Sequence, residues 1–128
     1  MSTEDFIDYI INEYEMIAPE ESGHDSDSFW KEVMTYYSDS MLKASVTKKN
    51  AARILYAFLR HVIKIPNVDW NNAKRLRDIY ECRVCAEAIA QTYERGIINA
   101  SAETAFGIND VMMEADLRDS VRKTLNYI

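Results

Sequence analysis

The sequence predicts an all-α fold, a small bundle of about five helices that forms a single domain over residues 1–128. Three observations predict it. Apolar residues recur at the spacing of an amphipathic helix along most of the chain. The chain has only three glycines and two prolines, fewer than a β-rich or disordered chain would use. A hydrophobic content of 48% over 128 residues is enough for one core.

Two amphipathic helices are expected in the acidic segment of residues 1–42. The first covers residues 3–17 and ends before Pro19, because proline cannot continue a helix. A polar loop over residues 20–28 separates it from the second helix, which covers residues 28–42. The apolar stripes of these two helices are formed by Phe6, Ile7, Ile10, Tyr14, Ile17, Trp30, Val33, Met34, Tyr37, Met41 and Leu42.

The third helix is expected to open at Thr47, whose hydroxyl would cap the first turn, and to end before Pro66. Its apolar face is formed by Ala51, Ile54, Leu55, Phe58, Leu59, Val62 and Ile63. Its opposite face carries Lys49, Arg53, Tyr56, Arg60 and Lys64. A basic stripe of this kind can bind nucleic acid. A net charge of −6 argues against that partner, so nucleic-acid binding is not the favoured interpretation.

Further helical segments are expected after residue 72. A short helix places Leu76, Ile79 and Tyr80 inward, and it either stands alone or runs on into a longer helix over residues 82–95. The last helix covers residues 113–127. Its inward residues are Leu117, Val121, Leu125 and Ile128.

A helix stop is expected at Gly96. Arg95 would place a cation among the exposed carbonyls of the last turn. Gly96 can take a left-handed backbone at low cost, and Ile97 and Ile98 would then fold back onto the helix. The polar stretch that follows has Phe106 as its one large anchor. The pattern predicts a helix–loop–helix joint.

The net charge is unevenly distributed along the chain. Residues 1–42 carry −10, residues 43–77 carry +8 and residues 78–128 carry −4. The favoured interpretation is that the acidic helices lie against the basic third helix and neutralise it. The alternative is that the acidic block is an interaction surface.

The two cysteines, Cys82 and Cys85, form a C-x-x-C motif. A zinc site would need a second pair of ligands, whereas His24 and His61 lie far from the motif and from each other in the sequence. The spacing also fits one face of a helix, where thiols are commonly buried. Packing in the core is therefore favoured over redox or metal chemistry, and no cofactor or metal is expected.

The sequence contains no catalytic signature. It has no glycine-rich phosphate loop, no helical histidine pair and no nucleophile motif, so we expect a non-enzymatic protein. No run approaches the roughly 20 apolar residues that a membrane span needs. The acidic start lacks the basic region of a secretory signal. The chain as written therefore fits the cytoplasm, and the cell surface only if a leader precedes it.

Two segments of the chain look alike, VTKKNA at residues 46–51 and MMEADL at residues 112–117. Between them lie, in order, LRDI at residues 76–79, GII at residues 96–98 and Phe106. This order resembles the S-layer homology domain. The repeat of that family has a phenylalanine–x–aspartate–valine/isoleucine start, a glycine–isoleucine–isoleucine stop, a phenylalanine loop and an isoleucine–threonine–arginine–alanine–glutamate helix start. The resemblance covers residues 46–125, about one repeat and a flanking helix.

The resemblance implies a binding module. Members of the family usually carry three repeats and bind an anionic cell-wall polysaccharide, for which the arginine of the motif is well suited. That position holds Lys48 in the first segment and Glu114 in the second, and a carboxylate there would repel an anionic polymer. The expected ligand-binding residues are Thr47 and Lys48. The structural alternative is a helix cap at Thr47 and a solvated ammonium at Lys48.

Two functions are therefore expected. The first is an S-layer-homology-like binding module for a cell-wall polymer, with a degenerate site. The alternative is an intracellular adaptor or inhibitor that presents the acids of residues 1–42 to a basic protein partner, as a nucleic acid would. For either function, eight tyrosines, six methionines and two tryptophans exceed what one small core hides and are compatible with a homodimer.

Overall fold

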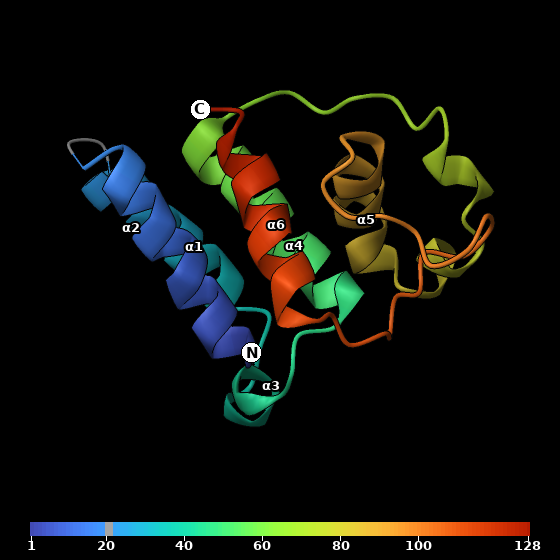
Figure 1. Ribbon diagram of the computed structural model, residues 1–128, viewed down its shortest axis with the longest axis horizontal. Helices are drawn as coiled ribbons and strands as arrows, with labels where there is room; N and C mark the ends of the chain where they lie inside the picture. Colours follow the sequence, from blue (N-terminus) through green and yellow to red (C-terminus); the bar gives the residue numbers. More distant parts are fainter. Residues whose placement is uncertain (20–21) are drawn as a thin grey trace.

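The computed structural model describes residues 1–19 and 22–128, and these residues form a helical bundle (Figure 1). Its α-helices are α1 (Thr3–Ile17), α2 (Ser22–Met34), α3 (Asp39–Lys43), α4 (Lys48–Phe58), α5 (Arg83–Glu94) and α6 (Glu114–Leu125). Three short turns complete the fold, namely the π-helical η1 (Leu59–Ile63) and the 3₁₀-helical η2 (Ala73–Arg75) and η3 (Asp78–Glu81). The described residues contain isolated β-bridges but no strand. The all-α prediction is confirmed.

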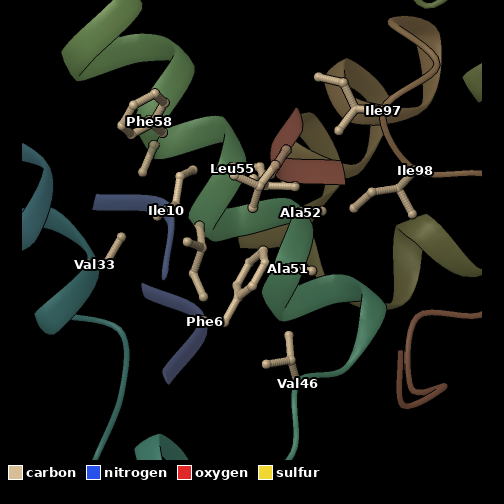
Figure 2. Close-up of a cluster of buried hydrophobic side chains, with 14 of the residues drawn as sticks. Phe6, Ile10, Val33, Val46, Ala51, Ala52, Leu55, Phe58, Ile97 and Ile98 are labelled. Atoms are coloured by element: carbon tan, nitrogen blue, oxygen red, sulfur yellow. The ribbon is translucent and has the colours of Figure 1, made fainter. Parts of the chain in front are cut away.

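Helix α4 lies at the centre of the bundle and contacts α1, α2, α5 and α6. Figure 2 shows its apolar side chains between residues of α1 and α2 on one side and Ile97 and Ile98 on the other. Phe58 is fully buried, and its ring meets those of Tyr14 and Phe29 edge to face, with centroids 5.3 and 5.4 Å away. Such edge-to-face pairs add to the stabilisation from burial. The expected apolar face of the third helix is thus the centre of the core.

The expected single helix over residues 28–42 is wrong, because α2 ends at Met34 and α3 begins at Asp39. Ser38 lies between them in an extended conformation, and its hydroxyl accepts a hydrogen bond from the backbone N–H of Met41 at 3.4 Å. A serine that caps a new helix competes with continuation of the preceding one. Within the predicted stripe, Trp30 and Met41 are exposed, and the buried position belongs to Phe29 instead.

The loop expected over residues 20–28 is also corrected, because α2 already begins at Ser22; Glu20 and Glu21 lie outside the described residues. The first helix has the expected bounds, although Ile17 at its end is exposed. The third helical segment ends at Ile63, the last residue of η1. Lys64, which follows, has a left-handed backbone (φ 62°) and stops the helix two residues before Pro66.

The short helix expected after residue 72 is replaced by the two 3₁₀ turns η2 and η3. Leu76 and Ile79 are buried as predicted, whereas Tyr80 points outward. In α6, Leu117, Val121 and Leu125 are buried as predicted. Ile128 is exposed, because the helix ends three residues before it.

The connector between η1 and η2 is fastened to α5 by polar side chains. The Glu87 carboxylate accepts hydrogen bonds from Trp70 Nε1 at 2.6 Å and from Asn67 Nδ2 at 2.7 Å. The amide of Gln91 donates to the carbonyl of Val68 and accepts from its N–H, each at 2.8 Å. The Gln91 bonds satisfy the backbone groups of Val68, which no helix or strand pairs, and the Glu87 bonds fix two side chains of the connector.

The acidic and basic segments pack together as expected, since α2 contacts both α4 and η1. Glu32 Oε2 lies 3.5 Å from His61 Nε2, and Glu32 also accepts a hydrogen bond from the Tyr36 hydroxyl. The guanidinium of Arg53 lies 3.9 Å from the centroid of the Tyr36 ring. Burial and the bond to Glu32 raise the pKa of Tyr36 to about 12. Aromatic packing and the Tyr36 hydrogen bond therefore hold this contact.

The part of the chain that the structure describes contains no helix long and apolar enough to cross a bilayer.

Candidate functional site: a groove between a clamped loop and two helix starts

The helix stop predicted at Gly96 is confirmed. Gly96 has a left-handed backbone (φ 70°), and its N–H donates to the carbonyl of Tyr93 at 3.0 Å. The N–H groups of Ile97 and Ile98 both donate to the carbonyl of Thr92, at 2.9 and 3.3 Å. Both isoleucine side chains are buried against the core. The chain therefore leaves α5 in a fixed direction, toward the starts of α4 and α6.

The loop that follows is held on one side by Asp78, which η3 supplies. Its Oδ1 accepts from the N–H of Phe106 at 2.8 Å, and its Oδ2 accepts from those of Gly107 at 2.8 Å and Ile108 at 3.2 Å. Burial alone would raise the pKa of the Asp78 carboxyl. The backbone N–H donors outweigh it and hold this pKa below its ordinary value.

Lys48 holds the same loop from the other side. Its ammonium donates to the carbonyls of Asn99 and Phe106 and to the hydroxyl of Ser101, each at 2.8 Å. An ammonium has three donors, so all of them are used within the protein. The ammonium also lies 5.2 Å from the centroid of the Phe106 ring. Burial lowers the pKa of Lys48, and neighbouring carboxylates oppose that shift.

The predicted hydroxyl cap at Thr47 is wrong. Thr47 does occupy the N-cap position of α4, but its side chain makes no capping bond, and Oγ1 is buried without a partner among the described residues. The reason lies in the loop, whose carbonyls take the N–H groups at the helix start. The N–H of Lys48 donates to the carbonyl of Asp110 at 2.9 Å, and that of Lys49 to the carbonyl of Ile108 at 3.0 Å.

The turn at Gly107 requires glycine. Its backbone is left-handed (φ 84°), and a Cβ placed there would lie 2.3 Å from Ser101 Oγ and 2.4 Å from Asp110 Oδ2. These two groups are themselves bonded, because the Ser101 hydroxyl donates to Asp110 Oδ2 at 2.8 Å. A side chain at this position would break that bond and strain the backbone.

A groove of about 280 Å³ lies between this loop and the starts of α4 and α6. We call it the loop groove. It is lined by Lys48, Ile97, Ile98, Asn99, Ala100, Ser101, Asp110, Val111, Met112, Met113, Asp116, Asp119 and Lys123. The structure thus places one predicted site residue, Lys48, in the groove wall, whereas Thr47 is not part of the lining.

The polar groups of the loop groove differ in their availability. Lys48 is bonded to the loop, and Lys123 Nζ lies 3.0 Å from Asp119 Oδ2. The side chains of Asn99 and Asp116 are exposed and make no hydrogen bond or ion pair with the described residues. Met113, at 74% exposure, adds apolar surface. The groove therefore offers the Asn99 amide, the Asp116 carboxylate and an apolar wall to a ligand, whereas the Asp110 carboxylate already accepts a bond from Ser101.

The predicted packing of two free thiols is wrong, because Cys82 and Cys85 are joined in a disulfide. Cys82 is not on the helix face but at the N-cap of α5, in an extended conformation, which brings its sulfur toward Cys85 in the first turn. Cys85 is buried, as predicted. Among the described residues, no group of three or more histidine, cysteine, aspartate or glutamate side chains is placed to hold a metal ion.

Sequence reasoning did not assign Asp78, Ser101, Gly107 and Asp110 to the site. Asp78 and Asp110 lie within the segments that carry the family resemblance, and Gly107 is one of only three glycines. A glycine between the two large apolar residues of a polar loop, Phe106 and Ile108, was the available signal for a tight turn. No protein-family model, curated protein or solved structure matches this chain.

We predict that Asp78→Asn destabilises the protein by about 1.5–3 kcal/mol at pH 7, the range for hydrogen bonds to a charged group. The folded pKa of Asp78 lies below the unfolded value, so its contribution is present above about pH 4 and is lost as the pH falls through the folded pKa. Urea unfolding should show that the free energies of unfolding of Asp78→Asn and wild type differ less at pH 3 than at pH 7.

The matched control for this measurement is Asp69→Asn, which changes an exposed aspartate of the connector. It should unfold like wild type at both pH values. If Asp78→Asn lowered the free energy of unfolding by the same amount at pH 7 and pH 3, this carboxylate would not be the charged acceptor of the loop.

Proposed function

We propose that the protein is a non-enzymatic binding module with an S-layer-homology-like scaffold, and that it binds a cell-wall polysaccharide in the loop groove. The observation that carries the proposal is the location of this groove. It lies where residues 46–51, residues 112–117 and the loop after Gly96 meet, and these are the segments that carry the resemblance.

The groove chemistry favours a hydroxyl-rich, uncharged stretch of such a polymer. Asp116 places a free carboxylate at the groove, which would repel an anionic group. Sugar hydroxyls can donate to that carboxylate and can both donate to and accept from the Asn99 amide. The exposed side chains of Val111 and Met113 suit the C–H face of a sugar ring. In this proposal Lys48 acts by shaping the groove wall.

We predict that the protein co-sediments with purified cell-wall sacculi and that the double substitution Asn99→Ala/Asp116→Ala weakens this binding at least about tenfold. The magnitude follows from the loss of one neutral and one charge-assisted hydrogen bond. The measurement is the bound fraction as a function of sacculus concentration, with soluble neutral wall polysaccharide as a competitor.

The control variant is Asp69→Ala, which removes an exposed carboxylate outside the groove and should bind like wild type. Circular dichroism and thermal unfolding establish that all three proteins are folded. Failure of the wild type to sediment, or equal binding by the double variant, would refute the polysaccharide site.

A second candidate function is supported by the acidic face of α1. Asp5, Asp8, Asn12 and Glu15 are exposed at positions that share one side of this helix. The three acids among these four residues form no ion pair with the described residues. The neighbouring Met16 adds exposed apolar surface. A surface of this kind fits a basic protein partner. One such partner is a nucleic-acid-binding protein, whose binding surface the acids would occupy in place of phosphates.

We predict that a basic partner bound by this face is lost on the triple charge reversal Asp5→Lys/Asp8→Lys/Glu15→Lys. The measurement is affinity capture with the wild type, this variant and a control variant. The control reverses three exposed acids outside α1, namely Asp69, Glu81 and Glu103. The partner should be retained by the wild type and the control in dilute buffer and released at about 0.5 M salt, where screening is strong. Equal capture by the α1 variant would exclude the acidic face.

A further inference from the structure

The two cysteines of the disulfide at the start of α5 differ in solvent exposure. Cys82 is at the N-cap and is only partly buried, whereas Cys85 is in the first turn and is 2% exposed. The N–H of Cys85 also donates to the carbonyl of Cys82 at 3.1 Å. Cys82 is therefore the more exposed of the two cysteines to an incoming thiol.

The start of a helix is a favourable place for the thiolates that disulfide exchange requires. The first N–H groups of a helix have no partner within it and carry partial positive charge, which stabilises an anion there. Arg83, which is exposed between the two cysteines, adds a cation. Cysteines in C-x-x-C motifs and at helix starts are accordingly prone to react as thiolates.

Apolar side chains flank Cys82 on the protein surface. Tyr80, two residues before it, is 56% exposed, and Val84, two residues after it, is 73% exposed. Both lie close in the sequence to the partly buried Cys82, Tyr80 on η3 and Val84 on α5. These side chains give a polypeptide that docks beside the disulfide apolar surface to bury.

The loop that this disulfide closes is very short, since only two residues separate the cysteines. The constraint that a disulfide places on the unfolded chain grows with the length of the closed loop. A bond across two residues therefore contributes less to stability than bonds across long loops. Its position at a helix start is better explained by chemistry than by stabilisation.

From these observations we infer that Cys82 and Cys85 are a reversible dithiol–disulfide pair that exchanges with a cysteine-containing polypeptide docked on Tyr80 and Val84. The inference is independent of the binding function proposed above. In the forward step a thiolate of the polypeptide attacks Cys82 Sγ, forming a mixed disulfide and releasing Cys85 as a thiolate that takes up a proton. A second thiolate of the polypeptide then attacks its own mixed-disulfide sulfur and releases Cys82.

The products balance as one disulfide in the polypeptide and two thiols in this protein, with two electrons passing from the polypeptide dithiol to the Cys82–Cys85 bond. The reverse reaction uses the same steps, with the Cys82 thiolate attacking a polypeptide disulfide. No oxidant or reductant beyond the polypeptide is required for either direction of a single turnover.

The test compares two single-cysteine variants with one probe, a fluorescent peptide that carries an intramolecular disulfide flanked by leucines. Cys85→Ser leaves the accessible Cys82, and the matched control Cys82→Ser leaves the buried Cys85. Mixed disulfide with the peptide, followed on non-reducing gels, should form at least tenfold faster with Cys85→Ser. Equal rates for the two variants would overturn the inference.

Docking is tested by adding Tyr80→Ser/Val84→Ser to Cys85→Ser. The added substitutions should slow the reaction with the peptide at least fivefold and leave the reaction with oxidised glutathione unchanged. An equal effect on both probes, or no effect on the peptide, would overturn the docking surface.

A measurement on the wild type covers the case in which a single-cysteine variant does not fold. Excess reduced peptide dithiol is added to the native protein, and thiols are trapped by alkylation and counted by mass spectrometry. Cys82 and Cys85 should gain two alkyl groups while one peptide gains a disulfide. Persistence of the Cys82–Cys85 bond until the protein is unfolded would overturn the inference.

Discussion

Phe106 is held by two opposite charges, and the arrangement around the loop groove depends on this contact. Its carbonyl accepts from the ammonium of Lys48 at 2.8 Å, and its N–H donates to the carboxylate of Asp78 at 2.8 Å. The loop between α5 and α6 has little regular structure, so its backbone groups need partners from elsewhere. Lys48 and Asp78, which together we call the clamp, each bond to several backbone groups of the loop. The buried Phe106 ring keeps the loop on the core.

The clamp also fixes the starts of two helices. Loop carbonyls take the first N–H groups of α4, and the N–H of Met112 donates to the carbonyl of Val46 just before α6 begins. Since α4 is the centre of the core, the position of the loop is tied to the packing of the whole bundle (Figure 1). The groove is therefore a consequence of how the loop closes the fold. Among the described lining residues, Asn99 and Asp116 have side chains that make no hydrogen bond or ion pair within the protein and can bind a ligand.

The sequence predicted those parts of the fold that are determined by residues close to one another in the chain. The helical period located α1, α4, α5 and α6, and Gly96 located the end of α5. The break at Ser38 was missed because a capping hydroxyl competes with an otherwise continuous apolar pattern. The cysteine spacing suggested one helix face, whereas Cys82 precedes the helix. Lys48 was singled out by its place in the motif that carries the resemblance, but its acceptors Asn99 and Phe106 are 51 and 58 positions away, which no local pattern reveals.

The most direct test of the clamp is amide hydrogen exchange in Lys48→Met compared with Lys49→Met. Both substitutions remove one ammonium from the first turn of α4 and leave the backbone N–H in place, but of the two ammonium groups only that of Lys48 bonds to the loop. The account predicts faster exchange at Phe106, Gly107 and Ile108 in Lys48→Met, with wild-type rates in Lys49→Met and in the middle of α4 for both. Equal protection of the loop in the two variants would contradict it.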